Sequence, residues 1–173
     1  MSGLGVDLGH AFNDNLTKKI GEILSYLQSQ GCPEQIHAGV ILGSGLGEYT
    51  EALRITHTIP YSDIPSFPQS TVEGHSGALI FGNLEDCTIM AFSGRFHFYE
   101  GYEIDETVIP VQLIHAIGAK KLLISNAAGG INLSYNVGDL MVIDNIIRPH
   151  SRMMQQSSTV SYTHLTLPTI LLV

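Results

Sequence analysis

The sequence is poor in positive charge. Lysine and arginine together number 8, against 16 aspartates and glutamates, and the formal net charge is −8. Nucleic acids are bound by clustered basic side chains that meet the phosphate backbone. The few basic residues form no run, so the composition argues against DNA or RNA as a partner. A small anionic ligand stays compatible with it, because one well-placed arginine and several backbone N–H groups can bind a phosphate.

Cysteine and long apolar runs are also scarce. Cys32 and Cys87 lie far apart in no metal-binding spacing, which predicts two free, buried thiols in a reducing compartment. The first residues lack the basic segment and apolar core of a signal peptide. No stretch approaches the ~18 apolar residues that a membrane-spanning helix needs. We therefore expect a cytoplasmic protein.

The residues that are abundant favour a packed domain. Apolar residues make up 44% of the chain and charged residues 14%, which excludes a disordered or coiled-coil protein. A helix is predicted over 12–30, where apolar residues recur at helical spacing, with Asn13 or Asp14 as its cap. Gly31 and Pro33 are expected to end it.

Short apolar segments alternate with a second helix farther along the chain. Strands are predicted at 38–42, 78–81, 88–92, 122–125 and 140–144. The second helix is expected at 107–117, with Pro110 tolerated in its first turn. Residues 58–77 contain three prolines and are expected to form a long irregular connection. This order predicts an α/β fold with a mixed, largely parallel sheet flanked by helices.

Glycine-bearing loops follow three of the predicted strands, at 43–47, 93–102 and 126–130. In such sheets ligands bind beyond the carboxyl ends of strands, so these loops are expected to converge. Residues 43–47 read Gly-Ser-Gly-Leu-Gly and offer an anion backbone N–H groups and the Ser44 hydroxyl. They form neither the dinucleotide-binding fingerprint nor a Walker loop. Alone, this segment fits a tight strand-to-helix turn equally well.

The second loop is denser in functional groups. Arg95, His97, Tyr99 and Glu100 lie within a few residues of a predicted strand end. Arginine presents a planar fork of donors to phosphate, and histidine can move a proton near neutral pH. The alternative is a solvated loop whose aromatic rings pack locally. So many ionisable groups beside glycines favour a binding site.

Two other segments offer weaker signals of the same kind. His75 lies between Gly74 and Ser76 and could be a further anion ligand, although a lone histidine is more often a hydrogen-bonded loop residue. Asn126 and Ala127 open an Asn-Ala-Ala-Gly-Gly segment, whose small side chains suit a contact made through the backbone.

Together these motifs resemble the trimeric purine nucleoside phosphorylases. Four segments occur in the order and spacing of that family: 43–47, 74–75, 94–102 and 126–130. The resemblance runs from about residue 40 to residue 144. The related methylthioadenosine phosphorylases share the fold, but the Ser44 loop and the segment 95–102 are more similar to the purine nucleoside enzymes.

The resemblance implies a role for each candidate residue. Phosphate would be bound by Ser44, His75, Arg95, His97 and the Ala127 backbone. Tyr99 and Asn126 would contact the nucleoside, Tyr99 against its ribose. His97 and Glu100 would have catalytic roles, with Glu100 supporting His97 or the phosphate.

The reaction implied is phosphorolysis of purine ribonucleosides and 2′-deoxyribonucleosides in purine salvage. Phosphate attacks C1′ of the sugar, the purine leaves, and ribose 1-phosphate forms. The resemblance implies no metal and no organic cofactor, since inorganic phosphate is itself a co-substrate. It also implies a homotrimer for a full-length protein.

The chain departs from the family pattern after Asp144. Family members are longer and continue with Asp-His-Ile-Asn, where this chain reads Asn-Ile-Ile-Arg. We expect residues 1–150 to be part of a nucleoside phosphorylase domain and 151–173 to be a tail unlike the family, disordered or non-native. An edge strand is the alternative for this tail. Because the family's purine-binding residues are missing, we expect the 173-residue chain to be an inactive fragment.

Two other functions compete with this interpretation. The same sheet could carry a non-catalytic module that binds phosphate or a nucleotide. A dinucleotide-dependent oxidoreductase is disfavoured, because the glycine fingerprint and a ribose-binding acidic residue are missing.

Overall fold

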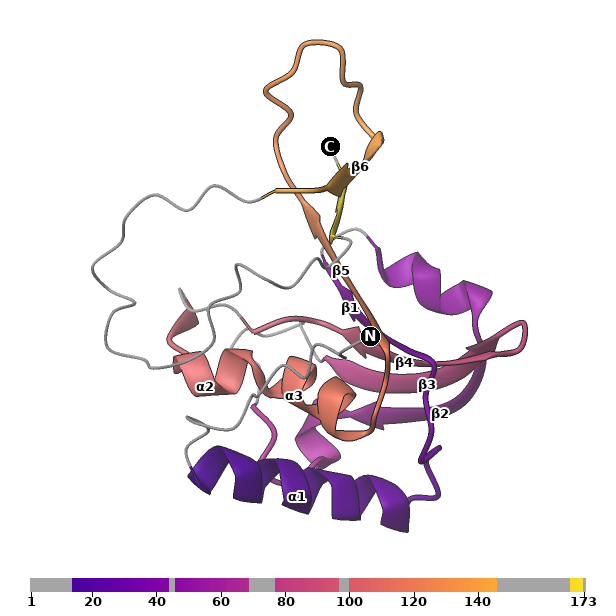
Figure 1. Ribbon diagram of the computed structural model, residues 1–173, viewed down its shortest axis with the longest axis vertical. Helices are drawn as coiled ribbons and strands as arrows, with labels where there is room; N and C mark the ends of the chain where they lie inside the picture. The colour runs from indigo at the N-terminus through magenta and orange to yellow at the C-terminus, as the bar shows by residue number, and fades with distance from the viewer. Residues whose placement is uncertain (1–13, 44–45, 69–76, 97–99, 146–168, 173) are drawn as a thin grey trace, which may run out of the picture.

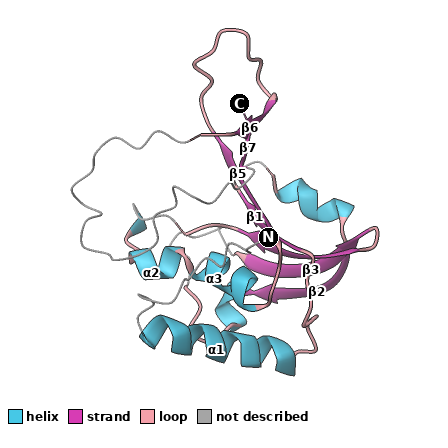
Figure 2. Cartoon of the chain, viewed as in Figure 1, coloured by secondary structure: helices cyan, strands magenta, loops and turns pink. Residues whose placement is uncertain are grey.

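The computed structural model of the chain places a mixed sheet among helices (Figures 1 and 2). It describes residues 14–43, 46–68, 77–96, 100–145 and 169–172. The strands in these residues are β1 (Ala38–Leu42), β2 (Arg54–Pro60), β3 (Ala78–Leu84), β4 (Cys87–Ser93), β5 (Lys121–Ala127), β6 (Leu140–Ile143) and β7 (Thr169–Leu172). The helices are α1 (Asp14–Ser29), α2 (Ile104–Thr107) and α3 (Ile109–Ala116), with the 3-10 helices η1 (Gly47–Ala52) and η2 (Tyr61–Asp63). The predicted α/β class, a mixed sheet flanked by helices, is confirmed.

Parallel pairing occupies the centre of the sheet. The strand order is β2-β3-β4-β1-β5-β7-β6, in which β1 pairs in parallel with both β4 and β5, and β5 with β7. The outer pairs β2–β3, β3–β4 and β6–β7 are antiparallel. The register aligns Leu42 with Ser93, and Ile41 with Ile124. The carboxyl ends of β1, β4 and β5 therefore meet at one edge.

Each face of the sheet has its own apolar layer, because successive side chains of a strand point to opposite faces. On one face Ile41, Leu79, Phe81, Met90 and Phe92 pack in one cluster with residues of α1 and α3. On the other, Val40, Leu42, Ile80, Ile89 and Ala91 pack with Leu53 and, at their margin, with Tyr49 of η1. Figure 1 shows α1 and α3 together on one side of the sheet.

The first predicted helix is confirmed as α1. Its buried residues Leu16, Ile20, Ile23 and Leu27 form the apolar stripe that the sequence indicated. The second predicted helix, 107–117, is confirmed as α3, which begins at Ile109, and the short helix α2 that precedes it was not predicted. A capping box between Glu103 and Glu106 starts α2, and Pro110 lies in the first turn of α3 as predicted.

Helix α3 packs directly onto β1 at Gly39. A Cβ atom added to this glycine would lie 2.4 to 2.6 Å from three side-chain carbons of Ile114. The close approach of helix and strand therefore depends on the missing side chain.

The expected irregular connection at 58–77 is wrong at its start. Residues 54–60 form the edge strand β2, which pairs antiparallel with β3. Its side chains are mostly exposed, so it lacks the apolar run by which the other strands were recognised. Pro60 ends the strand, a position where its missing N–H group costs no ladder bond. The β-branched residues Ile55, Thr56, Thr58 and Ile59 were the available signal.

Two boundaries also differ from expectation. Strand β5 continues through Asn126 and Ala127, which the sequence placed in a loop. Residues 169–172 form β7, which lies between β5 and β6 and not at an edge, where the alternative prediction for the tail had placed a strand. Residues 151–168 lie outside the described residues, so the division of the chain near residue 150 stays a prediction.

The connection from β5 to β6 extends away from the sheet (Figure 1). Its apolar side chains Ile131, Leu133 and Val137 are 96%, 101% and 100% exposed. Leu140 and Val142 of β6 are also largely exposed. This part of the chain therefore presents apolar surface that no described residue covers.

Candidate anion site

Three predicted loops meet around the backbone of Gly43. A Cβ atom added to Gly43 would lie 2.5 Å from the carbonyl oxygen of Ser125 and 2.8 Å from the Cα atom of Asn126. It would lie 3.0 Å from the Nη2 atom of Arg95. The ends of β1, β4 and β5 thus bring an arginine fork against a glycine backbone, which is an arrangement suited to a small anion.

Ser125 joins two of these strand ends. It is 2% exposed, and the Gly43 N–H group donates a hydrogen bond of 3.0 Å to its Oγ atom. The hydroxyl in turn donates to the carbonyl of Ile41 at 3.4 Å. Because both polar partners belong to the end of β1, Ser125 holds the backbone from which the glycine loop departs.

Arg95 follows a glycine with an unusual backbone conformation. Gly94 has φ of +111°, a value that side chains with a Cβ atom rarely adopt. Its carbonyl accepts a 3.0 Å hydrogen bond from the hydroxyl of Tyr61. Burial raises the pKa of this phenol well above its ordinary range, so the hydroxyl keeps its proton and remains a donor.

Phe96 anchors the other side of Arg95 in the core. Its ring is 8% exposed and lies 5.2 Å from Tyr102, 5.4 Å from Tyr61 and 5.5 Å from Phe67, measured between ring centroids. Part of the aromatic content of this loop therefore serves packing. Arg95, half-buried, stands between a hydrogen-bonded glycine and a buried ring.

The structure brings together some of the predicted site residues. Arg95 and Asn126 both lie against Gly43, and Ala127 follows at the exposed end of β5. The side-chain amide of Asn126 donates to the Ala127 carbonyl at 3.3 Å. Glu100 is partly exposed and directly precedes a turn at Gly101. Ser44, His75, His97 and Tyr99 lie outside the described residues, and their roles stay predictions.

Sequence reasoning missed Ser125 and Tyr61. Ser125 had a signal, since it is the single polar residue at the end of the apolar run 122–124. Tyr61 had none, because it lies in the proline-containing segment that was expected to be irregular.

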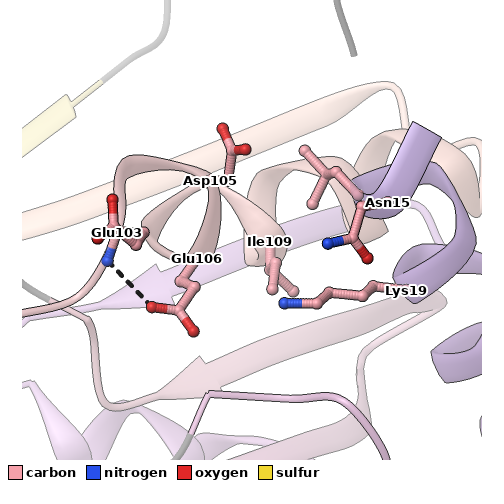
Figure 3. A pocket seen from close by; sticks show the side chains of 7 residues that line it. Asn15, Lys19, Glu103, Asp105, Glu106 and Ile109 are labelled. Carbon is pink, nitrogen blue, oxygen red and sulfur yellow. Dashed lines mark hydrogen bonds between the residues drawn. The ribbon is translucent and has the colours of Figure 1, made fainter. Parts of the chain in front are cut away.

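A pocket of about 170 Å³ lies elsewhere, between the start of α1 and α2–α3 (Figure 3). Its lining includes Lys19, Glu103, Asp105 and Glu106. The Glu106 carboxylate accepts a 3.0 Å hydrogen bond from the Glu103 N–H group, which the capping box explains. The pocket shares no residue with the predicted anion site.

The described residues form neither a metal-ion site nor a membrane-spanning helix. Within the ranges that the structure describes, no group of three or more His, Cys, Asp or Glu side chains could hold a metal ion. In the same ranges, no helix is long and apolar enough to cross a bilayer.

Comparison with known proteins identifies close relatives of this chain. The family model of the phosphorylase superfamily matches residues 37–164. Purine nucleoside phosphorylase 1 of Geobacillus stearothermophilus is 50% identical over 115 residues, which cover 66% of this chain and 42% of that protein. The purine nucleoside phosphorylase of Mus musculus is 47% identical over 111 residues, covering 64% of this chain and 38% of that protein.

Solved structures show the same relationship. The purine nucleoside phosphorylase of Schistosoma mansoni in complex with inosine superposes with a TM-score of 0.66 at 38% identity, covering 73% of this chain and 44% of that one. A purine nucleoside phosphorylase in complex with ribose-1-phosphate gives a TM-score of 0.67 at 40% identity, covering 73% and 46%. The chain thus spans less than half the length of the relatives it matches.

Proposed function

Because the chain belongs to the phosphorylase superfamily, we propose that the whole protein is a purine nucleoside phosphorylase. It transfers the pentosyl group of a purine nucleoside to inorganic phosphate and releases the free base. The observation that carries this proposal is the approach of the Arg95 guanidinium and of the Asn126 backbone to Gly43, at the carboxyl ends of β1, β4 and β5.

Phosphate is the ligand that this edge suits best. The guanidinium of Arg95 can donate two parallel hydrogen bonds to one phosphate. Ser44, His75, His97 and the Ala127 N–H group complete the proposed phosphate site. Tyr99 and Asn126 contact the nucleoside, and Glu100 supports His97 or the phosphate. Related structures that contain inosine or ribose-1-phosphate support a nucleoside and a sugar phosphate as ligands.

The reaction needs positioning and charge more than covalent help from the protein. A phosphate oxygen forms a bond to C1′ while the bond from C1′ to the purine nitrogen breaks, and its electron pair leaves with the purine. The sugar becomes oxocarbenium-like in the transition state, where the bound dianion beside it is stabilising. No metal or organic cofactor enters this mechanism.

Two further properties belong to the proposal. The enzyme works in the cytoplasm, where the free thiols stay reduced; Cys32 is buried as predicted, whereas Cys87 is exposed at the start of β4. The whole protein assembles as a homotrimer, with purine nucleoside and phosphate as its small-molecule partners.

The proposal is tested with the whole protein, expressed from its complete reading frame. We expect hypoxanthine release from inosine that depends on phosphate, together with stoichiometric ribose 1-phosphate. Omission of phosphate is the control. Binding of phosphate without any base release would instead identify the non-catalytic binding module. Release that ignores phosphate would identify a hydrolase, and either result contradicts the proposal.

A further inference from the structure

Tyr61 makes three contacts with two glycines, Gly77 directly before β3 and Gly94 directly after β4. Its N–H group donates to the Gly77 carbonyl at 3.0 Å, and its hydroxyl donates to the Gly94 carbonyl at 3.0 Å. Its ring covers Gly77 so closely that an added Cβ atom there would lie 2.2 Å from the ring. Gly77 and Gly94 also lie side by side, since a Cβ atom on Gly94 would be 3.3 Å from the Gly77 Cα atom. Tyr61 thus joins the amino end of β3 to the carboxyl end of β4.

The hydroxyl acts on the peptide group that leads into Arg95. The Gly94 carbonyl and the Arg95 N–H group belong to one planar peptide unit. A hydrogen bond to that carbonyl therefore fixes the plane from which Arg95 departs. Gly94 is the flexible point of this segment, with φ of +111°, so an external restraint matters most here.

The ring of Tyr61 acts on the other neighbour of Arg95. Its centroid lies 5.4 Å from that of Phe96 and 4.7 Å from that of Phe67. Arg95 is therefore flanked on both sides by residues that Tyr61 contacts, one through the hydroxyl and one through the ring.

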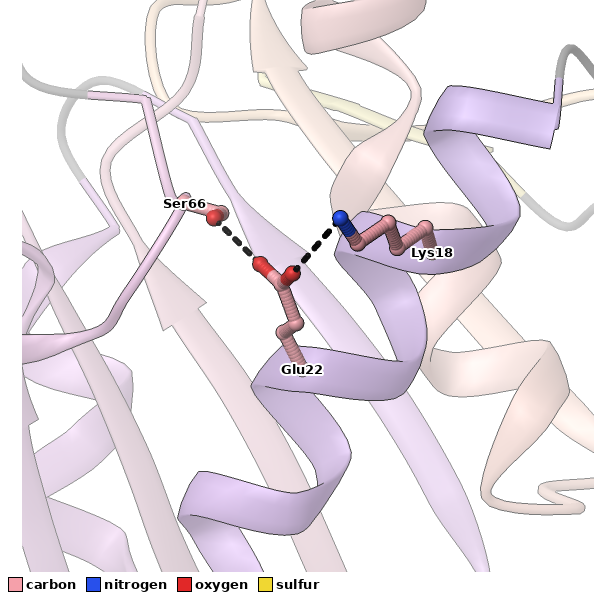
Figure 4. A network of polar contacts seen from close by, with 3 residues as sticks. All are labelled: Lys18, Glu22 and Ser66. Atoms are coloured by element: carbon pink, nitrogen blue, oxygen red, sulfur yellow. Dashed lines mark hydrogen bonds and ion pairs between the residues drawn. The ribbon is translucent and has the colours of Figure 1, made fainter.

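The segment that carries Tyr61 is itself anchored outside the loops. Tyr61 is 3% exposed and directly follows β2. Farther along, the Ser66 hydroxyl donates a 2.7 Å hydrogen bond to the Glu22 carboxylate of α1, and Lys18 lies 3.9 Å from the same carboxylate (Figure 4). Through these contacts, the segment that restrains Arg95 is itself held by helix α1 and by strand β2.

We propose that Tyr61 is a positioning residue that holds the Arg95 guanidinium in its phosphate-binding place. This inference rests on the proposed phosphate site. It assigns to Tyr61 no contact with substrate, and its effect reaches phosphate through Arg95.

The test is Tyr61→Phe in the whole protein, because this change keeps the ring and removes the hydroxyl. We expect the dissociation constant of inorganic phosphate, measured by calorimetry, to rise about 2- to 12-fold, which corresponds to one neutral hydrogen bond. The KM for inosine should change less than twofold. Ile89→Val is the control, since it removes buried apolar volume from the cluster on the other face of the sheet, near the start of β4, and should leave phosphate affinity unchanged.

A double-mutant cycle separates positioning from general stability. If Tyr61 acts through Arg95, then Tyr61→Phe should have little further effect on phosphate affinity in an Arg95→Lys background. Gly77→Ala tests the same contact from the other side, because its Cβ atom must displace the Tyr61 ring, and it should weaken phosphate binding as well. Unchanged phosphate affinity in Tyr61→Phe, or an equal effect in both backgrounds, would overturn the inference. Calorimetry with phosphate needs no turnover, so a failure of the proposed reaction is seen separately in the inosine assay.

Discussion

Arg95 matters through its shape as well as its charge. A lysine at this position keeps the positive charge but loses the planar fork that binds two phosphate oxygens at once. We predict that Arg95→Lys in the whole protein lowers kcat/KM for phosphate. The expected loss is about 1.5–3 kcal/mol, the range of hydrogen bonds to charged groups, or roughly 10- to 150-fold.

Arg54 provides the matched control for this change. It lies on the exposed edge strand β2, and Arg54→Lys should leave both kinetic constants of phosphate unaltered. Steady-state kinetics with varied phosphate at saturating inosine measures both variants. If Arg95→Lys behaves like Arg54→Lys, then Arg95 does not bind phosphate.

The sequence indicates residues of a site better than it indicates what supports them. The sequence predicted Arg95 from the ionisable and aromatic groups beside glycines near a strand end, and Asn126 from a segment of small residues suited to a backbone contact. Ser125 bonds to a backbone group 82 positions away in the chain, and Tyr61 to one 33 positions away. A local sequence pattern does not indicate partners at such distances. Supporting residues of this kind become visible only when the strands are placed beside one another.

At the scale of elements, the packing of α3 on β1 depends on one missing methyl group. We predict that Gly39→Ala lowers the free energy of unfolding by about 1–3 kcal/mol, as overpacked cores do. The cause is the overlap between the new Cβ atom and Ile114. Urea denaturation followed by circular dichroism measures the change.

Two further variants test whether the overlap with Ile114 is the cause. Gly21→Ala on α1 meets no atom within 4 Å and should stabilise the protein by about 0.5–1 kcal/mol, since alanine favours a helix. In the double variant Gly39→Ala, Ile114→Ala, the two losses should be less than additive because the removed side chain makes room. Strict additivity would show that Ile114 is not what limits the approach of the helix.

The elements themselves were largely predictable where burial was strong. Strands β1, β3 and β4 and helix α1 carry apolar patterns that follow from facing a core on one or both sides. Strand β2 was not predicted, because an exposed edge strand needs few apolar residues. Helix α2 was missed because its four residues are too few to show an apolar period.

At the scale of the whole molecule, the 173 residues alone should not catalyse phosphorolysis. The chain spans 42% of its Geobacillus stearothermophilus relative, and stabilisation of the departing purine is expected from residues without a counterpart here. Loss of one transition-state donor typically costs about 2.7–4 kcal/mol, and loss of a whole base pocket costs more. Hypoxanthine release by the folded 173-residue polypeptide should fall at least a hundredfold below that of the whole protein. Comparable rates would contradict both this prediction and the assignment of the purine site.

The exposed apolar connection predicts self-association of the same polypeptide. Ile131, Leu133 and Val137 present side chains that water solvates poorly. Light scattering should show a mean mass that rises with concentration, and Leu133→Lys should reduce the rise. Gln30→Lys adds the same charge at an exposed position at the end of α1 and should not. Equal behaviour of the two variants would show that association involves another surface.

The central place of β1 also decides when the site can form. Strands β3 and β4 are joined by a turn at Glu85 and Asp86, whereas the Gly43–Ser125 hydrogen bond closes a loop of 82 residues. Closing a long loop costs chain entropy that is recovered only when the distant strands have paired. The β3–β4 hairpin should therefore form early and the anion site among the last features of folding. The phosphate site is then absent from the folding transition state. Phosphate therefore stabilises the native state mainly by slowing its unfolding, and it leaves the folding rate nearly unchanged.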